Sequence, residues 1–436
     1  MTRGSYKYAW YTVVLLTIAY IFSFVDRYIL GLLVQPIKDD LGLSDTEIGL
    51  LLGPAFALFY TTMGLPLGWL ADRARRTWIV SAGIAIWSLA TAACGLARSF
   101  GQLFLARVSV GVGEATLSPC ALSMIADSFP EERRGKPIAF YSAALTLGAG
   151  IASLAGASVL AWSKTVTDID LPLVGQVAPW QFAFIIVGLP GLPLAVMMFF
   201  LREPKRQDLV DIGDGGKAGL MDALRYIGKR RRTYVGFTAI VCIMTVVAYS
   251  QGWLPAMFER TWGWPTEKYA LYNGLVLLLL GPACVNFAGW TSDRLSAAGR
   301  RDAPLLIVIT GVLILVPTGV LAPLMPNAWA AFIMLQLNTV GIAILSATAP
   351  TALLNITPGQ IRGQVVALYI IVISIAGLML GPTSIGLMND YVFGEEGIRY
   401  STALVPLLVG VPILLTVRGT RRAYLRELDE MQPGRS

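Results

Sequence analysis

Four charged residues interrupt apolar stretches in the first third of the chain: Asp26, Arg27, Arg107 and Glu114. A poorly hydrated carboxyl group can take up and release a proton, and an arginine can hold an anionic group through two parallel hydrogen bonds. Arg107 and Glu114 are seven residues apart, so they share one face of a helix. Histidine is absent, which excludes imidazole metal sites, catalytic triads and imidazole proton relays. Proton transfer and anion binding therefore fall to carboxylates and guanidinium groups.

The composition requires that most of the chain lies in lipid. Of its 436 residues, 55% are hydrophobic and 14% charged, against roughly a quarter charged in soluble domains. The length accommodates about a dozen helices of about 20 apolar residues, with little left for an extramembrane domain. The four cysteines show no metal-ligand or paired spacing. We expect no metal, no cofactor and no soluble enzyme.

Apolar runs, broken at charges and Gly/Pro clusters, predict an all-α integral membrane protein with twelve transmembrane helices. They fall near residues 9–35, 47–70, 77–97, 102–127, 136–162, 181–201, 233–258, 268–290, 303–325, 327–355, 360–389 and 400–417. The first is too long for a signal peptide and is read as a retained helix. The predicted domains are a six-helix bundle at 1–201, a connector at 202–232, and a second bundle with a basic tail at 233–436.

The distribution of lysine and arginine predicts the orientation. Alternate loops, the connector and both termini hold 26 of these residues and the remaining loops hold 6, which assigns both termini and the connector to the cytoplasm. The net charge of +7 is spread over short loops, so we expect no nucleic-acid partner. The basic connector is also suited to binding anionic membrane lipid. The plasma or inner membrane is the expected location.

Two motifs repeat between the halves. Gly68-Trp-Leu-Ala-Asp72-Arg73 returns as Gly289-Trp-Thr-Ser-Asp293-Arg294, 221 residues later. Pro130-x-x-x-Arg134-Gly135, followed by Tyr141, returns as Pro358-x-x-x-Arg362-Gly363, followed by Tyr369, 228 residues later. Similar offsets predict two parallel six-helix halves, an arrangement of transporters in which the substrate site lies between the halves.

Helix geometry predicts how deep the intramembrane charges lie. Each costs on the order of 3 kcal/mol at the bilayer centre, so they are expected to face the protein interior. With a rise of about 1.5 Å per residue, Asp26 and Arg107 meet at one level and Glu114 lies about 10 Å deeper, near the midplane. We expect Asp26 to pair with Arg107 in one conformation and Glu114 to exchange a proton. Alternatively, the pair only ties two helices together and Glu114 is inert.

The second half lacks these charges and offers neutral polar groups instead. An anionic head near Arg107 and an apolar tail along the other bundle would suit such a cavity. A lone amide in a membrane helix also serves to join helices, which is the alternative for each of these residues. The candidate cavity-lining residues, with two tyrosines of the first half included, are Tyr60, Tyr141, Tyr249, Gln251, Asn273, Gln336, Asn338 and Tyr369.

The motif Gly68-x-x-x-Asp72-Arg73, together with Arg107-x-x-x-Gly111-x-Gly113, resembles the signatures of the major facilitator superfamily across the whole chain. The chain departs from the first signature at Arg75 and Thr77. Within this superfamily, three segments resemble the spinster family of lipid transporters. They are Asp26-Arg27-Tyr28-x-Leu30, Ile37-Lys38-x-Asp40-Leu41-x-Leu43-Ser44-Asp45 with Gly49-Leu50-Leu51, and Arg107 to Ala115. Anion:cation symporters share the Asp-Arg and Arg…Glu pattern.

The resemblance implies roles for these residues. Asp26, Arg27, Arg107 and Glu114 form the transport site. A cytoplasmic gate, held by charge-assisted bonds between helix ends, comprises Gly68, Asp72, Arg73, Arg76, Arg134, Asp293 and Arg294; their alternative role is topology alone. Gly148, Gly150, Gly377, Gly381 and Pro382 allow close packing or bending.

The function expected from residues and resemblance is secondary active transport by alternating access, coupled to protons. The substrate implied by the resemblance is a lipid-like amphiphile, a lysophospholipid or a sphingoid phosphate. Two alternatives are a proton-coupled symporter of a small organic anion and a drug/proton antiporter. A membrane-bound enzyme or a receptor without transport fits less well. The expected partners are the substrate, protons and membrane lipids, and the expected state is a monomer.

Overall fold

The computed structural model describes residues 3–71, 73–130, 133–163, 165, 169–171, 175–204, 220–358 and 361–431. Within these residues, twelve helical segments are long and apolar enough to cross a membrane. The prediction of twelve spans in an all-helical protein is therefore confirmed. The chain forms two compact units, which we call the first unit (Met1–Val210 and Gly252–Leu278) and the second unit (Asp211–Gln251 and Leu279–Ser436).

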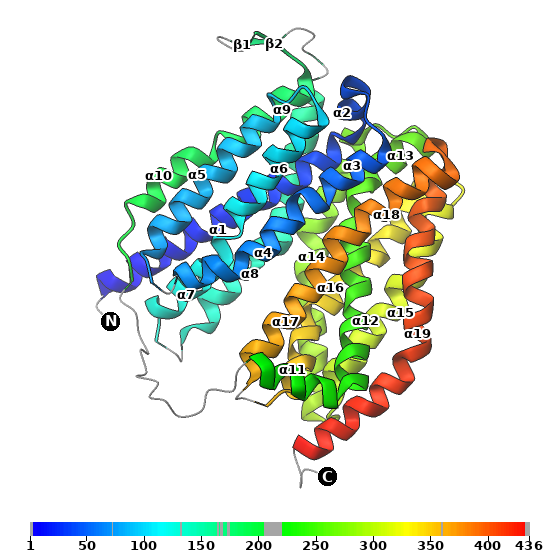
Figure 1. The fold of residues 1–436 in the computed structure, drawn as a ribbon. Coiled ribbons are helices and arrows are strands. Elements are labelled where there is room, and N and C mark those ends of the chain that lie inside the picture. Colours follow the sequence, from blue (N-terminus) through cyan, green and yellow to red (C-terminus); the bar gives the residue numbers. More distant parts are fainter. Residues whose placement is uncertain are drawn as a thin grey trace. The chain divides into compact units, whose positions relative to one another are not determined.

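The first unit contains the first six spans, several of them broken into two helices. Its elements are α1 (Arg3–Leu32), α2 (Val34–Leu41), α3 (Asp45–Leu52), α4 (Pro54–Ala71), α5 (Arg76–Cys94), α6 (Phe100–Glu114), α7 (Leu117–Ser128), α8 (Gly135–Ser163), α9 (Pro179–Gly188) and α10 (Gly191–Phe199). The strands β1 (Ile169–Leu171) and β2 (Gly175–Val177) form an antiparallel hairpin between α8 and α9. Helix α1 packs along α8, and α5 packs against α6 and α10 (Figure 1).

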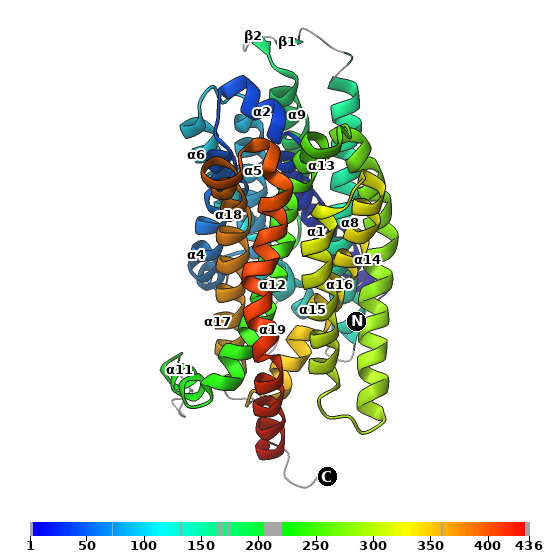
Figure 2. The ribbon, with the colours of Figure 1, turned by 90° about the vertical axis from the view of Figure 1, so that its right-hand side faces the viewer.

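The second half of the chain contains the other six spans. Its elements are α11 (Leu220–Lys229), α12 (Arg231–Ser250), α13 (Leu254–Trp262), α14 (Thr266–Ala297), α15 (Ala303–Leu321), α16 (Ala328–Asn355), α17 (Arg362–Ile375), α18 (Gly381–Met388) and α19 (Ile398–Met431). In the second unit α15 packs along α16, and α12 packs against α19 (Figure 2). Residues 252–278, with α13 and the start of α14, belong to the first unit.

Prolines break several predicted spans. Pro119 lies in the first turn of α7 and has no N–H to donate to the carbonyl of residue 115. The fourth span therefore consists of two helices, of which the first ends at Glu114 and the second begins at Leu117. Pro255 interrupts the seventh span in the same way, between α12 and α13. A π-helical turn over Ala376–Leu380 precedes Pro382 in the eleventh span. These breaks place helix ends within the predicted spans.

Glycines let the helices of the first unit approach closely. A Cβ atom on Gly113 would lie 2.8 Å from the carbonyl oxygen of Gly83 on α5, and one on Gly111 would lie 2.5 Å from that of Phe56 on α4. The signature glycines of α6 therefore sit where two neighbouring backbones leave no room for a side chain. Gly148 meets Phe24 in the same manner, as expected for the fifth span.

The predicted basic tail is an extension of the last helix. The span expected at 400–417 is part of α19, which continues to Met431. Tyr424 and Leu428 are buried, and the Tyr424 hydroxyl donates to the carbonyl of Ala352 at 2.8 Å. The tail remains ordered because these apolar side chains pack on the second unit and Arg421 pairs with Asp302 at 2.7 Å.

Candidate functional site

The intramembrane charges of α1 and α6 are all inside the first unit. Asp26, Arg107 and Glu114 are each 2% exposed. Arg27 Nη2 lies 2.5 Å from Glu114 Oε2, and Arg27 Nε donates to the same oxygen at 2.6 Å. Ser23 Oγ, one helical turn before Arg27, also donates to Oε2 at 2.6 Å. Glu114 Oε2 thus accepts from three donors, while its Oε1 has no hydrogen-bond partner among the described residues.

Aromatic rings surround the Arg27 guanidinium. Its central carbon lies 4.7 Å from the ring centres of Phe56 and Tyr60 and 5.4 Å from that of Phe24. Ring faces attract a guanidinium through the quadrupole of the π system, and more strongly where water is excluded. Arg27 is therefore held both by a carboxylate and by an aromatic enclosure. Tyr60, a candidate cavity-lining residue, belongs to this enclosure.

The side chain of Arg107 contacts the main chain of Asp26. Its Nη1 donates to the carbonyl oxygen of Asp26 at 3.0 Å, so the two residues meet at one level as expected. The expected pairing of their side chains is not what this conformation shows, because Arg107 bonds the main chain of Asp26 and not its carboxylate. Among the described residues, Asp26 Oδ1 and Arg107 Nε have no hydrogen-bond partner. Two polar groups of opposite charge thus remain available beside an established ion pair.

This geometry suits the binding of a negatively charged head group. Arg27 and Arg107 offer guanidinium groups, and an incoming anion can compete with Glu114 for Arg27. Removing Arg27 from Glu114 would leave a buried carboxylate without its counter-charge.

Two polar candidates of the second half, Asn338 and Gln251, form bonds between separate helices. Asn338 Nδ2 donates to the Leu315 carbonyl at 2.9 Å, and Asn338 Oδ1 accepts from Gln251 Nε2 at 3.3 Å. Gln336 Nε2 donates to a carbonyl of its own helix, that of Phe332, at 3.2 Å. The bond between Asn338 and α15 supports the alternative role of an amide that joins helices.

The remaining cavity candidates are Tyr141, Tyr369, Asn273 and Tyr249. Tyr141 stacks on Tyr20 of α1 with ring centres 4.9 Å apart. Tyr369 is 7% exposed and lines a groove within the second unit. Asn273 is half-buried in the first unit and Tyr249 is half-buried in the second.

Of the predicted gate, Arg76 forms the bonds expected between helix ends. It is 1% exposed and pairs with Asp127 of α7 and, at 2.7 Å, with Glu203 beyond α10. Its Nη1 also bonds Ser123 Oγ at 2.7 Å. Asp127 and Glu203 were missed in the sequence, although each is an acidic residue among the basic ends of the spans.

The other gate residues have different surroundings. Arg73 lies over Trp69 at 4.1 Å, Arg294 lies over Trp290 at 5.2 Å, and Asp293 is exposed. Arg134 Nε donates to the carbonyl of Phe129 at 2.9 Å. A Cβ atom on Gly68 would meet open space. Asp72 lies outside the described residues.

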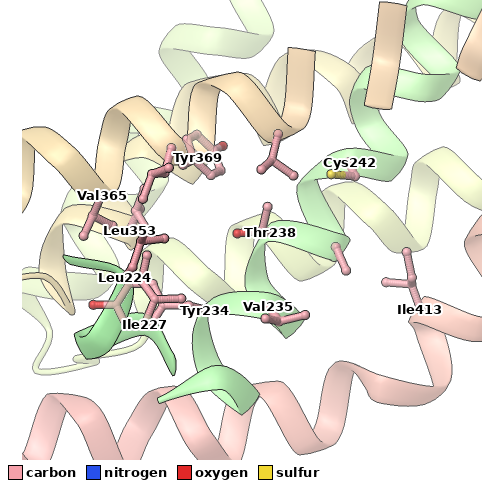
Figure 3. A pocket seen from close by; sticks show the side chains of 13 residues that line it. Leu224, Ile227, Tyr234, Val235, Thr238, Cys242, Leu353, Val365, Tyr369 and Ile413 are labelled. Atoms are coloured by element: carbon pink, nitrogen blue, oxygen red, sulfur yellow. The ribbon is translucent and has the colours of Figure 1, made fainter. Parts of the chain in front are cut away.

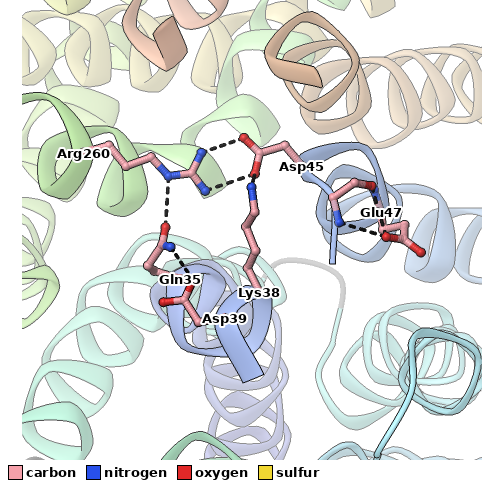
Figure 4. Close-up of polar contacts among 7 residues, drawn as sticks. Gln35, Lys38, Asp39, Asp45, Glu47 and Arg260 are labelled. Atoms are coloured by element: carbon pink, nitrogen blue, oxygen red, sulfur yellow. Dashed lines mark hydrogen bonds and ion pairs between the residues drawn. The ribbon is translucent and has the colours of Figure 1, made fainter. Parts of the chain in front are cut away.

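A second buried charge network, which sequence reasoning missed, joins the other end of the spans. Asp45 is fully buried at the start of α3 and accepts from Lys38 of α2 at 2.6 Å and from Arg260 of α13 at 2.6 and 3.0 Å. Gln35 also accepts from Arg260, at 3.0 Å (Figure 4). Lys38 and Arg260 are two of the few cations on the cation-poor side of the chain, a signal that could have marked them.

Local sequence positions Asp45 in this network. Ser44 caps α3, because Glu47 N donates to Ser44 Oγ at 3.2 Å and Ser44 N donates to Glu47 Oε2 at 2.9 Å. This reciprocal capping fixes the first turn and hence the direction of the Asp45 side chain. The carboxylate also lies at the helix N-terminus, where the macrodipole favours negative charge. Helix α13 is thereby held to α2 and α3 within the first unit.

The family of the protein follows from this fold and from sequence comparison. The profile of the Major Facilitator Superfamily matches residues 16–424, so the chain belongs to this superfamily of transporters. Within it, the resemblance to the spinster family is confirmed. The crystal structure of a bacterial homolog of the human lysosomal transporter Spinster, inward-facing and unoccupied, is 25% identical with a TM-score of 0.77, and the match covers 97% of each chain.

Other relatives carry different names. An MFS-type efflux pump of Mycolicibacterium smegmatis (strain ATCC 700084 / mc(2)155) is 29% identical over 414 residues, which are 93% of this chain and 90% of the pump. A probable L-galactonate transporter of Escherichia coli (strain K12) is 29% identical over 296 residues, 65% of this chain and 62% of that protein. Both names describe transport, and of the two only that of the Escherichia coli protein states a substrate.

Proposed function

We propose that this protein is a proton-coupled secondary transporter that works by alternating access and carries an anionic amphiphile of the lysophospholipid or sphingoid-phosphate type. The observation that carries the proposal is the buried Arg27–Glu114 pair inside an enclosure of aromatic rings. A head group with negative charge would bind the guanidinium groups, and apolar side chains would flank its tail. The likeness to the spinster homolog supports a spinster-like transporter, and a lipid-like substrate is what the resemblance of the sequence motifs implies.

The coupling proposed here depends on exchange of partners at Arg27. When the anionic head binds Arg27, Glu114 loses its counter-charge and takes up a proton. In the alternate conformation Asp26 and Arg107 pair through their side chains, as their contact through the Asp26 carbonyl permits. The two protonation states then bias two conformations, which is the requirement for coupled transport.

The outer end of the molecule is proposed to open by breaking the Asp45 network. Lys38 and Arg260 hold α13 against α2 and α3 in this conformation. An outward-open conformation would have to separate these charges and expose them to water. We place both termini and the connector in the cytoplasm of a plasma or inner membrane, on the strength of the charge distribution, and propose a monomeric transporter.

A small organic anion is the second candidate substrate, because the same guanidinium groups would bind a carboxylate and the probable L-galactonate transporter is a relative. A drug/proton antiporter is the third, supported by the name of the mycobacterial efflux pump. In both cases the proton site proposed at Glu114 stays the same, and the residues that line the substrate cavity determine which substrate is transported.

Reconstitution in proteoliposomes separates these candidates. Radiolabelled lysophospholipid is added to one leaflet, and extraction by albumin reports how much has crossed with and without a pH gradient. We expect gradient-driven transfer of unchanged lysolipid that an excess of galactonate does not inhibit. Uptake of galactonate without lysolipid transfer would overturn the lipid assignment, and transfer independent of the gradient would overturn the coupling.

A further inference from the structure

A groove within the second unit is separate from the charges described above. Its volume is about 440 Å³, and its walls come from α11, α12, α17 and neighbouring residues of α16 and α19 (Figure 3). The walls are predominantly hydrocarbon. One wall hydroxyl, that of Tyr234, is already engaged, because it donates to the Ile356 carbonyl at 2.7 Å. The groove therefore suits an apolar occupant.

The groove opens along one face of α12. Val235, Thr238 and Cys242 line it at intervals of three and four residues, so they form one stripe on the helix. Arg231, four residues before Val235, continues this stripe to the end of α12. From residue 231 to residue 242 the helix rises about 16 Å, a length comparable to an extended acyl chain. Val235 is 61% exposed, so the stripe is accessible from outside.

Cations without carboxylate partners among the described residues lie at the N-terminal end of α12. Lys229, Arg231 and Arg232 are exposed, and none of them has an ion pair within the described part of the chain. Arg230 differs, since Glu427 and Glu430 bind it at 2.5 and 3.0 Å. Leu224 and Ile227 of α11 line the groove, so α11 forms one wall of it and leads directly into this basic run.

We propose that this groove is a binding site for an anionic phospholipid of the surrounding bilayer. One acyl chain lies along Val235, Thr238 and Cys242, and the phosphate is bound at Arg231 with Lys229 and Arg232 beside it. Charge complementarity selects an anionic over a zwitterionic head group. This site goes beyond the proposed function, because the lipid stays bound and is not transported. The site also lies entirely within the second unit, whereas the charges of the proposed transport site belong to the first.

The test uses the intact protein, delipidated in detergent, and native mass spectrometry. Phosphatidylglycerol is expected to bind with roughly tenfold or higher affinity than phosphatidylcholine of the same chains, since each cation near an anionic head contributes to binding. The triple variant K229Q/R231Q/R232Q is expected to lose this preference. A matched control, R418Q/R422Q/R426Q, removes three exposed arginines of α19 that do not line the groove and is expected to keep it.

The native thiol of Cys242 gives a second readout that needs no variant. Bound phosphatidylglycerol is expected to slow alkylation of Cys242 by N-ethylmaleimide at least threefold, while half-buried Cys284 of α14 reacts at an unchanged rate. Equal binding of both lipids, or unchanged reactivity of Cys242, would overturn the proposal. Displacement of the lipid by glycerol phosphate at equal concentration would also overturn it, because the acyl chain would then be irrelevant. None of these measurements depends on transport.

Discussion

At the scale of single residues, Glu114 combines properties that a proton-coupling group requires. One oxygen accepts from Arg27 and Ser23, and the other has no hydrogen-bond partner among the described residues. It also ends α6, at a break in the fourth span. Loss of the cation beside this buried carboxylate would leave its charge unpaired, which is costly.

We expect Glu114→Gln to uncouple transport from the proton gradient. The amide keeps the shape of the side chain but cannot exchange a proton, so stimulation of uptake by an inward gradient should fall at least tenfold, while exchange of substrate between the two sides persists. The measurement is uptake into proteoliposomes with and without the gradient. Glu47→Gln, which changes a carboxylate of the α3 cap, is the control. Gradient stimulation equal to that of the unaltered protein would refute the role of Glu114.

At the scale of elements, close helix contacts hold the charged residues in register. Gly113 is one residue before Glu114 and meets both Gly83 and Trp87 of α5. Because there is no space at this contact, the position of Glu114 depends on the packing of α5 against α6. The glycine signature of the fourth span thus has a structural reason.

Gly113→Ala is expected to destabilise the protein by about 1–3 kcal/mol, the usual cost of overpacking. Gly101→Ala is the matched control, since Gly101 lies in the same helix and a Cβ atom there would meet open space. This control should be neutral or slightly stabilising, because alanine favours helix. Thermal unfolding in detergent measures both. Equal transition temperatures for the two variants would contradict the packing described here.

The Asp45 network gives a second prediction at this scale. Asp45→Asn leaves Lys38 and Arg260 buried without a counter-charge, and loss of one partner of a buried ion pair costs about 3–5 kcal/mol. Thermal unfolding in detergent should therefore begin at a clearly lower temperature. Asp39→Asn, which affects an exposed carboxylate bonded to Gln35, should shift the transition little. Shifts of equal size in both variants would show that the network is not stabilising.

At the scale of the whole molecule, the charge distribution predicts the orientation in the membrane. Arg75 lies on the cation-rich side and Thr165 on the other side of the predicted topology, and both are exposed. Single cysteines at these positions should differ in intact cells. A membrane-impermeant maleimide is expected to label Thr165→Cys and to label Arg75→Cys only after the cells are opened. The unaltered protein measures the background from the four native cysteines. The reverse pattern would invert the proposed topology.

The number of spans and the enclosure of the charges could be predicted because both follow from local physics. Lipid excludes charge and unpaired backbone groups wherever they occur, so apolar runs near 77–97 and 136–162 had to be helices. Asp26, Arg107 and Glu114 had to face the interior for the same reason, and each is buried. The division into halves at 201 and 233 stays a prediction from the repeated motifs, and the compact units differ from it in that residues 252–278 belong to the first unit. The tail was expected only as a basic segment beyond the last span.

Tertiary structure alone decided which groups meet. Depth along the helices placed Asp26 and Arg107 at one level, but in the folded chain Arg107 bonds the main chain of Asp26, and the ion pair between α1 and α6 is that of Arg27 with Glu114. Likewise, no spacing joins Asp45 to Arg260, which lies 215 residues away. A residue's depth is fixed by its own segment, whereas its partner depends on how separate helices pack, and that is a property of the folded chain.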